Sequence, residues 1–218
     1  MAAQSQHRRV RNVTLDAPHL RTIPPEGGKG DRTRSRLLDV AVERFAAEGF
    51  RRTSVSEIAR AVDLTPAAAY AYFAGKESLF IAAVDLDAEG LVEHARAVMR
   101  AGGLPTETVV QVLLVLAAKL DEHPLARRVL AGQEPEAIDR VLDLPSLAEF
   151  RDELGAELTR AQRRGEVRSD VDAYRLAAGL ETLVIALLMA QVQTGVQPGS
   201  DRALGIGTVL DAALRPPR

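Results

Sequence analysis

The sequence predicts an all-α protein with an N-terminal module of three helices and a larger C-terminal module of further helices. Apolar residues recur at three- and four-residue spacing along most of the chain, and no segment shows convincing strand alternation. Proline and glycine residues stand where such helices would begin and end. Charge and aromatic content differ between the two ends of the chain, which indicates two modules with different functions.

The formal net charge of −2 conceals a division near Phe80. Residues 1–80 hold 13 Lys and Arg against 9 Asp and Glu, whereas residues 81–218 hold 15 against 21. Six of the eight aromatic residues also lie between positions 45 and 80. Positive charge at one end suits contact with phosphates, so the N-terminal module is the candidate for nucleic-acid binding.

The sequence lacks cysteine, which excludes disulfides, thiolate zinc sites, iron–sulfur clusters and a cysteine nucleophile, and which suits a reducing cytoplasm. The basic residues near the N-terminus are not followed by the apolar stretch of a secretory signal. The most apolar run, residues 183–190, is flanked by Glu181 and Gln191, whereas a membrane span needs about 18 or more uncharged apolar residues. We therefore expect a soluble cytoplasmic protein with no membrane partner.

Residues 1–31 mix charges with prolines and glycines and show no regular period, so they are expected to form a flexible tail. The tail is either inert or a basic arm that reaches a DNA minor groove or backbone. From Arg32 the pattern is helical, and Gly49 ends this first helix, so that Phe50 can fold back onto its apolar face. That face consists of Leu37, Leu38, Ala41, Val42 and Phe45.

Two shorter helices are expected next. The first begins at Ser54, with Ser54 as the N-cap and Glu57 completing a capping box. After a two-residue break the second begins at Thr65-Pro66, an N-cap followed by proline at the first helical position, and it runs to about Phe73.

Two short helices joined by a tight turn, after a longer supporting helix, form a helix-turn-helix arrangement. The second of the pair would be the recognition helix, which enters a DNA major groove about 12 Å wide. Small residues keep this helix slim, namely Pro66, Ala67, Ala68 and Ala71. Spacing alone leaves a small helical bundle with tight turns as the alternative interpretation.

The segment 49–80, GFRRTSVSEIARAVDLTPAAAYAYFAGKESLF, resembles the DNA-binding domain of the tetracycline-repressor (TetR) family. The family pattern combines a glycine–aromatic pair, a short polar-to-apolar stretch, a turn, and a helix that closes on aromatic residues before a glycine, a lysine and an acid. In this sequence these features are Gly49-Phe50, Thr53-Ser54-Val55, Ile58-Ala59, Tyr70, Tyr72-Phe73 and Gly75-Lys76-Glu77.

The resemblance implies a set of DNA contacts. Ser54 and Tyr72 would hydrogen-bond phosphates, and Lys76 would pair with a phosphate at the start of the next helix, where a helix N-terminus favours anions. Phosphate contacts fix the register, whereas contacts to base edges carry sequence information. The residues implied to face the groove are Thr65, Pro66, Ala67, Ala68 and Tyr70.

Three positions depart from the family pattern. Asp63 stands in place of the usual turn glycine, and aspartate tolerates a left-handed backbone better than most residues. Ala67 replaces a second glycine, and Ala69 replaces a larger apolar residue. With alanines at three central positions of the recognition helix, we expect thymine-methyl contacts and DNA shape to contribute to operator choice.

The C-terminal module is expected to open with a long helix from Lys76 to about Met99, ending before Gly102. Thr106 would cap the next helix, which is apolar nearly all round and is therefore expected to be buried. Pro124, Pro135 and Pro145 would delimit short helices. Longer helices are expected over residues 146–164, 172–194 and about 200–214, with stops at Gly165 and Gly195.

Residues 163–188 resemble, more weakly, the junction between the two dimerisation helices of the same family. Two such hairpins would pack as a four-helix bundle across a two-fold axis, and burial within one monomer is the alternative. A dimer would place two recognition helices about 34–36 Å apart, so that it reads a palindrome. The candidate dimerisation residues are Leu154, Leu158, Leu180, Leu183, Val184, Leu187 and Leu188.

The resemblance also implies a small-molecule inducer among the middle helices. Its binding would change the distance between the two DNA-binding domains of the dimer. Because Phe150 and Tyr174 are the only aromatic residues beyond Phe80, a pocket of leucine, valine and alanine suits an aliphatic or acyl-type ligand better than a flat aromatic cation. The polar candidates for ligand contact, each as readily a surface residue, are His94, Gln111, Lys119, His123 and Gln162.

The sequence therefore predicts a tail over residues 1–31, a helix-turn-helix domain over 32–78, and a ligand-binding and dimerisation domain over 79–218. The expected function is that of a transcriptional regulator that binds a double-stranded DNA operator, as a homodimeric repressor released by an inducer. A transcriptional activator or a ligand-independent regulator is the alternative.

An enzyme is a remote third interpretation. Glu93-His94 and Glu122-His123 are adjacent pairs, whereas a helical metal site needs ligands one turn apart. The sequence also has no Gly-rich phosphate loop and no G-x-S-x-G elbow. We expect no catalytic residue, cofactor or metal, and association with the nucleoid only through DNA.

Overall fold

The computed structural model describes residues 28–102, 105–138, 140–195 and 200–217, and within these ranges every long regular element is a helix and there is no strand. The all-α prediction is confirmed. Except for residues 28–31, the predicted tail lies outside the described residues, and the first helix begins at Lys29 rather than at Arg32.

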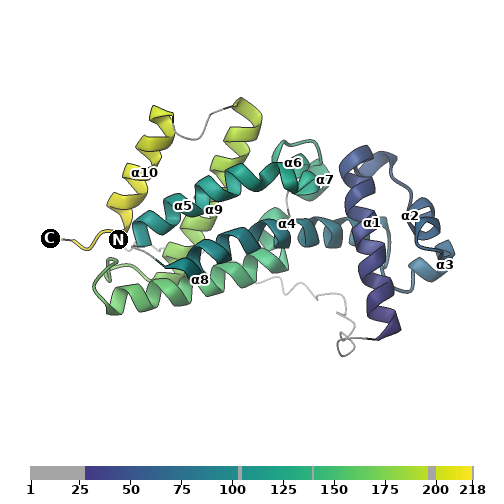
Figure 1. Ribbon diagram of the computed structural model, residues 1–218, viewed down its shortest axis with the longest axis horizontal. Coiled ribbons are helices and arrows are strands. Elements are labelled where there is room, and N and C mark those ends of the chain that lie inside the picture. Colours follow the sequence, from purple (N-terminus) through teal and green to yellow (C-terminus); the bar gives the residue numbers. More distant parts are fainter. Residues whose placement is uncertain (1–27, 103–104, 139, 196–199, 218) are drawn as a thin grey trace, which may run out of the picture.

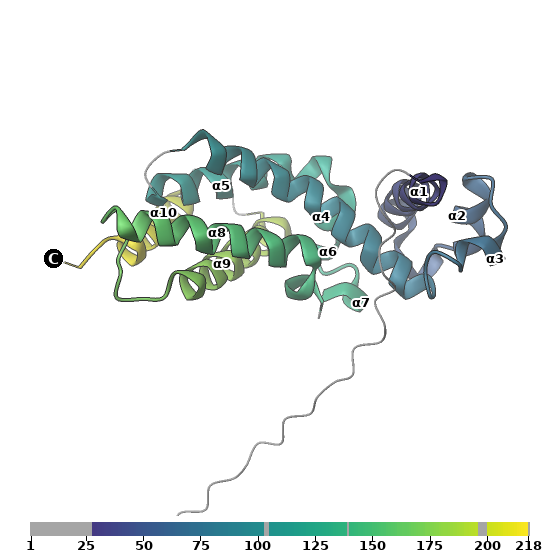
Figure 2. The same ribbon diagram turned by 90° about the horizontal axis from the view of Figure 1, so that it is seen from below.

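The helices lie in two groups along the molecule, with α1, α2 and α3 at one end and α5, α8, α9 and α10 toward the other (Figures 1 and 2). The long helix α4 runs between the groups. The bounds are α1 Lys29–Arg52, α2 Val55–Ala61, α3 Pro66–Ala69, α4 Lys76–Ala101, α5 Pro105–Lys119, α6 Pro124–Leu130, α7 Pro135–Ile138, α8 Pro145–Arg163, α9 Ala173–Thr194 and α10 Asp201–Leu214, with short 3₁₀ turns η1 Leu120–Glu122 and η2 Val141–Asp143.

The N-terminal group, α1 to α3 with the start of α4, is called the head and closes around aromatic side chains. Phe45 and Phe80 are fully buried with their ring centroids 4.9 Å apart, and Phe50 lies 4.9 Å from Phe80. Phe50 reaches this core because Gly49 adopts φ 81°, a left-handed value that turns the end of α1 back on itself. Burying one such phenylalanine stabilises the fold by about 1.5–3 kcal/mol.

Local residues set most boundaries of the helix-turn-helix. Asp63 has φ 62°, as predicted for the residue in place of the turn glycine, and the Thr65 hydroxyl caps α3 by accepting the Ala68 N–H at 3.2 Å. The predicted capping box at Ser54 is wrong. Ser54 is the N-cap of α2, but its side chain makes no cap hydrogen bond, and Glu57 donates its backbone N–H to the Ser54 carbonyl instead.

The recognition helix is shorter than predicted but does not end abruptly. Although α3 covers four residues, the N–H groups of Tyr72 and Phe73 both donate to the Ala69 carbonyl, so tight helical turns continue to Phe73. We call residues 65–73 the recognition segment.

The C-terminal helices begin and end largely as predicted. Pro124, Pro135 and Pro145 each occupy the first position of a helix. The Asp172 carboxylate caps α9 by accepting the Arg175 N–H at 2.9 Å, and Gly195 ends α9 with φ 71°. Between α8 and α9, which pack as a hairpin, residues 164–172 form the connecting loop.

Two predictions about α5 are wrong. The helix begins at Pro105, so Thr106 lies in its first turn rather than capping it. It is also buried on one face only: Val109, Val112 and Leu116 are buried, whereas Leu114 is 43% exposed. Figure 1 shows α5 between α4 and α10, and the exposed positions of α5 include the polar Glu107 and Gln111 as well as Leu114.

Among the described helices, α9 is long and apolar enough to cross a membrane by length and composition. It provides no run of 18 or more uncharged apolar residues, as predicted, because Arg175 and Glu181 interrupt it. With these two charges in 22 positions, the helix still meets the looser criterion of length and average composition. These two properties are weak evidence for a span, since core helices of proteins that never enter a membrane share them. In this fold α9 packs against α8, and its Glu181 pairs with Arg151.

Candidate nucleic-acid interface and ligand cavity

The recognition segment presents small side chains and one tyrosine at the far end of the head. Thr65 and Ala67 are exposed, Pro66 and Ala68 are partly exposed, and Tyr70 is 53% exposed. Ala69 is buried and fixes the segment to the head core. The five residues predicted to face the groove thus share the surface of one short segment that is narrow enough for a major groove.

Of the three predicted phosphate contacts, Ser54 and Lys76 lie on either side of this segment and Tyr72 lies near its end. Ser54, Tyr72 and Lys76 are all partly buried, which restricts their side chains. The Lys76 ammonium donates to the Arg51 carbonyl at 3.1 Å and lies 4.6 Å from the Phe50 ring centroid. An ammonium has three donors, so Lys76 keeps donors for a phosphate while the end of α1 holds it in place.

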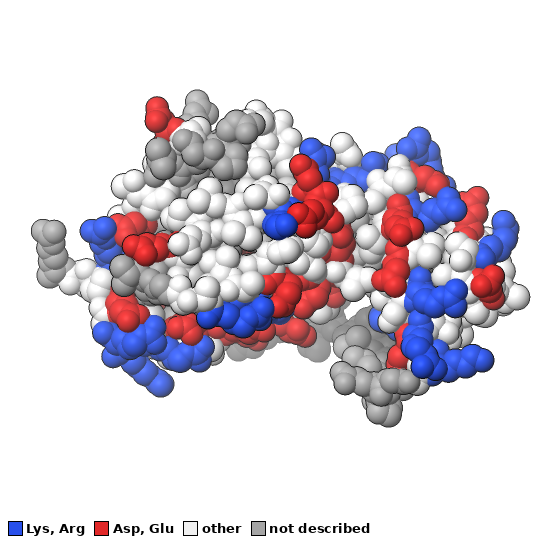
Figure 3. Space-filling model, in the orientation of Figure 1, with Lys and Arg blue, Asp and Glu red and all other residues white. Residues whose placement is uncertain are grey.

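Further basic side chains surround the recognition segment, and sequence reasoning did not single them out. Lys and Arg side chains gather at the head end of the molecule, with acidic side chains among them (Figure 3). The Arg34 guanidinium lies 5.1 Å from the centroid of the Phe73 ring, at the end of the segment, and Arg36 forms an exposed pair with Asp63 at 3.8 Å. Cation–π contact orients Arg34 beside the predicted interface.

A cavity of about 110 Å³ lies among α4, α5, α6, α8 and α9. Its lining is almost wholly aliphatic, in agreement with the apolar pocket expected from the sequence. In the described part of the chain, Thr108 and Glu181 are the only residues of this lining with polar side chains. Typical aliphatic members are Leu91, Val112, Leu130, Leu147, Val184 and Ile185.

None of the five polar ligand candidates belongs to the described lining of this cavity. His123 Nδ1 lies 3.3 Å from the Asp87 carboxylate, and the His94 ring packs edge-on against the His123 ring. Lys119 pairs with Glu122 at 2.6 Å, and Gln111 is exposed on α5. Gln162 donates to the carbonyls of Arg168 and Val171 at 2.8 Å each, so it holds the α8–α9 loop.

The structure divides the candidate dimerisation residues into two groups. Leu158, Leu180 and Leu188 are buried within the monomer. Leu183 is 48% exposed, and Leu154, Val184 and Leu187 are partly buried. The outward face of α9 therefore carries Leu183 with small or polar neighbours, and three of the seven residues serve the monomer's own core.

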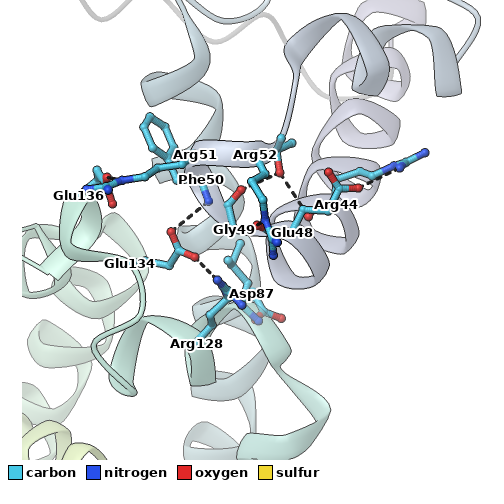
Figure 4. A network of polar contacts seen from close by, with 12 residues as sticks. Arg44, Glu48, Gly49, Phe50, Arg51, Arg52, Asp87, Arg128, Glu134 and Glu136 are labelled. Carbon is cyan, nitrogen blue, oxygen red and sulfur yellow. Dashed lines mark hydrogen bonds and ion pairs between the residues drawn. The ribbon is translucent and has the colours of Figure 1, made fainter.

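A buried carboxylate joins the head to the C-terminal module (Figure 4). Glu134, which is 2% exposed, accepts the Phe50 N–H at 3.0 Å through Oε2 and pairs with Arg128 through Oε1. Nearby, Arg51 and Glu136 form a pair at 3.0 Å, and the pKa of Glu136 is lowered by a backbone hydrogen bond and by this arginine. These contacts fix the end of α1 to the segment between α6 and α7.

The segment between α6 and α7, which holds the end of α1, is connected to the cavity through α6. The buried Asp87 carboxylate on α4 accepts the N–H groups of Leu125 and Ala126 at 2.8 Å each, which satisfies the first turn of α6. Ala126, Val129 and Leu130 line the cavity from α6. Both α4 and α6 thus touch the cavity and the head.

A helix-turn-helix at one end of an all-α fold, with a separate module of helices behind it, defines a helix-turn-helix DNA-binding protein. Residues 37–83 match the family model described as "Bacterial regulatory proteins, tetR family". The helix-turn-helix part of the chain is thus similar to that of TetR-family proteins, and the chain is a DNA-binding transcriptional regulator.

Curated relatives and a solved structure agree with this assignment. The chain is 27% identical over 192 residues to the uncharacterized HTH-type transcriptional regulator YdgC of Bacillus subtilis, a match that covers 86% of this chain and 95% of YdgC. It is 28% identical over 178 residues to the HTH-type transcriptional regulator BetI of Rhizobium meliloti, a match that covers 77% of this chain and 81% of BetI. A solved structure described as "Molecular basis for control of antibiotic production by a bacterial hormones" superposes with a TM-score of 0.60 at 26% identity, covering 84% of this chain and 98% of that one.

Proposed function

We propose that the chain is a homodimeric cytoplasmic repressor that occupies a palindromic operator and leaves it when a small apolar molecule fills the cavity. The observation that carries this proposal is the course of α4. Phe80 and Ala83 of this helix pack in the head core, whereas Leu91, Val92 and Ala95 line the cavity. A ligand that fits only one placement of α4 would therefore favour one spacing of the two heads.

The size of the cavity supports a coupling of this kind. About 110 Å³ is smaller than the roughly 300–1,000 Å³ of typical small-molecule sites. A ligand of more than a few carbons must therefore displace helices of the wall, of which α4 and α6 also reach the head, because protein interiors are close-packed and transmit such displacements. Both α4 and α6 contact α1 of the head.

In the proposed complex, repression is occlusion of a promoter by the bound dimer. Ser54, Tyr72 and Lys76 contact phosphates, and the groove-facing residues are those of the recognition segment named above. Residues 32–78 form the DNA-binding domain and residues 79–218 the ligand-binding and dimerisation domain, with the boundary inside the continuous α4. We assign no catalytic residue, cofactor or metal to either domain.

The dimer interface in this proposal is formed by the outward faces of α8 and α9. Leu183 is exposed there in the monomer, and the neighbouring Gly179, Thr182 and Ala186 are small enough to let two helices approach closely. Analytical ultracentrifugation tests this arrangement. Leu183→Arg is expected to shift the protein toward the monomer, and Leu142→Arg, at an exposed leucine in η2, is the control.

The function is tested by fluorescence-anisotropy titration of the purified protein against DNA from upstream of its own gene, with a scrambled duplex of equal length, at several salt concentrations. Tight, salt-dependent binding to the native fragment alone is the expected result. Deletion of the gene separates repression from activation, since the regulated transcript rises in the first case and falls in the second.

A further inference from the structure

Glu181 is the acidic side chain among the described residues that line the cavity, where Thr108 is the other polar one. It lies on the inward face of α9 between Leu180 and Val184 and is 6% exposed. Burial of a carboxylate among aliphatic groups is unfavourable unless hydrogen-bond donors surround it. A stability role alone does not explain its position, because a leucine there would complete the aliphatic wall.

Only half of this carboxylate has a partner. Oε2 accepts a hydrogen bond from Arg151 of α8 at 2.9 Å. Oε1 is buried and has no hydrogen-bond partner among the described residues. Glu181 belongs to the cavity lining and Arg151 does not, so Arg151 anchors the carboxylate from outside the lining while Oε1 keeps no partner among the described residues. Burial raises the pKa of Glu181, which agrees with a carboxyl group that lacks a full set of donors.

We propose that Glu181 Oε1 is the polar recognition point of the inducer site, and that the ligand is a short aliphatic molecule with one hydrogen-bond donor, a hydroxyl or an ammonium group. This inference rests on the function proposed above and specifies the ligand of the same cavity. The aliphatic body is buried by the wall, and the donor satisfies Oε1. An aliphatic carboxylate offers no donor to this oxygen and places a second negative charge beside it.

The cavity volume limits the length of the first probes. A cavity of about 150 Å³ lined by apolar side chains holds one benzene molecule, and the cavity here is about 110 Å³. Chains of about seven carbons therefore exceed this volume and must stretch the cavity. Suitable probes are 1-heptanol, its isomer hexyl methyl ether, heptylamine and heptanoate, of which the ether matches the alcohol in atoms but has no donor.

Isothermal titration calorimetry of these four probes into the full-length protein tests the inference. We expect 1-heptanol or heptylamine to bind about tenfold or more tightly than the ether, because a buried acceptor is satisfied only by the donors. Heptanoate is expected to bind more weakly than the ether. The comparison of alcohol with ether in the unaltered protein needs no variant, and whichever donor binds more tightly identifies the head group.

Glu181→Leu provides the matched variant, and Glu149→Leu, at an exposed glutamate of α8, is the control. The first change is expected to abolish the preference for the donor and to leave ether binding unchanged or tighter, whereas the control keeps the preference. Equal binding of alcohol and ether, tightest binding of heptanoate, absence of binding by all four probes, or a preference that survives Glu181→Leu would overturn the inference.

Release of operator DNA by the same probes, measured by anisotropy, separates this inference from the proposed function. Donor-selective binding without release of DNA supports the role of Glu181 and contradicts induction through this cavity. Release of DNA without any donor preference supports induction and overturns the role of Glu181.

Discussion

Glu134 connects the head to the C-terminal module, and its replacement by alanine is expected to destabilise the whole chain. The change removes the acceptor of the Phe50 N–H and the partner of Arg128 in one step. Alanine is small and apolar, so it offers no substitute for either contact. Because α1 contacts the C-terminal helices through this region, the loss weakens the junction rather than one helix.

The size of the effect follows from the two contacts. A hydrogen bond to a charged acceptor contributes about 1.5–3 kcal/mol. Breaking a buried ion pair costs about 3–5 kcal/mol when the remaining charge stays buried, but the Arg128 side chain is 24% exposed and can turn toward water. We therefore expect Glu134→Ala to lower the free energy of unfolding by about 3 kcal/mol, and Glu134→Gln, which keeps an acceptor for Phe50, by roughly half of that.

Urea denaturation followed by circular dichroism measures this loss. Glu136→Ala is the matched control, because Glu136 is two residues away and pairs with the largely exposed Arg51, an arrangement expected to contribute less than about 1 kcal/mol. If Glu134→Ala and Glu136→Ala reduced the free energy of unfolding equally, the buried carboxylate drawn in Figure 4 would not hold the junction between the head and the C-terminal module.

Three other changes test the interface and the cavity. Lys76→Ala is expected to weaken binding to native and scrambled DNA alike and to reduce the slope of log affinity against log salt by about 0.9, as for one lost phosphate contact; an unchanged slope in anisotropy titrations would exclude that contact. Tyr70→Ala is expected to change the order of affinities in a panel of operator variants, and a uniform loss would indicate a phosphate role instead. Because the pKa of Glu181 is raised in the folded protein, the folded state binds a proton more readily than the unfolded chain, so stability relative to Glu181→Gln should rise as pH falls from 7.5 toward 5, by at most about 1.4 kcal/mol per pH unit. Urea unfolding at each pH measures this difference, and a difference that stays constant or shrinks as the pH is lowered contradicts it.

The helix boundaries were predictable where short-range chemistry determines them. Thr65 and Asp172 accept backbone N–H groups three residues ahead, and Asp63 takes the left-handed backbone that its place in the pattern requires. Ser54 shows the limit of this reasoning. Its sequence context fits a capping box, but a capping box depends on side-chain rotamers that neighbouring helices also influence, and in this fold the hydroxyl makes no cap contact.

Burial was less predictable than helix position, because it depends on packing between distant segments. The composition of α5 suggests burial on all sides, yet Leu114 is 43% exposed although α4, α9 and α10 all contact this helix. Leu158, Leu180 and Leu188 belong to the same apolar pattern as Leu183, and sequence alone does not distinguish the three that fill the monomer from the one that stays exposed.

The two candidate sites differ in how far a sequence can specify them. The proposed DNA contacts lie within one continuous segment from Ser54 to Lys76, so a local motif identifies them. The cavity draws its wall from five helices, and its residues come together only in the folded chain. Glu181 was overlooked among polar candidates, although a signal existed: it is the only acidic residue in α9 and shares a helical face with Ala177 and Leu188.

The proposed coupling sets a requirement on the ligand that follows from the position of the cavity. A ligand that binds both placements of α4 equally well shifts nothing, however tightly it binds. Moving the dimer from about 99% DNA-competent to about 1% requires a preference of roughly 5.5 kcal/mol for the released form. A small cavity meets this requirement more readily than a large preformed one, because a ligand that fits only after α4 and α6 move apart binds the expanded form almost exclusively.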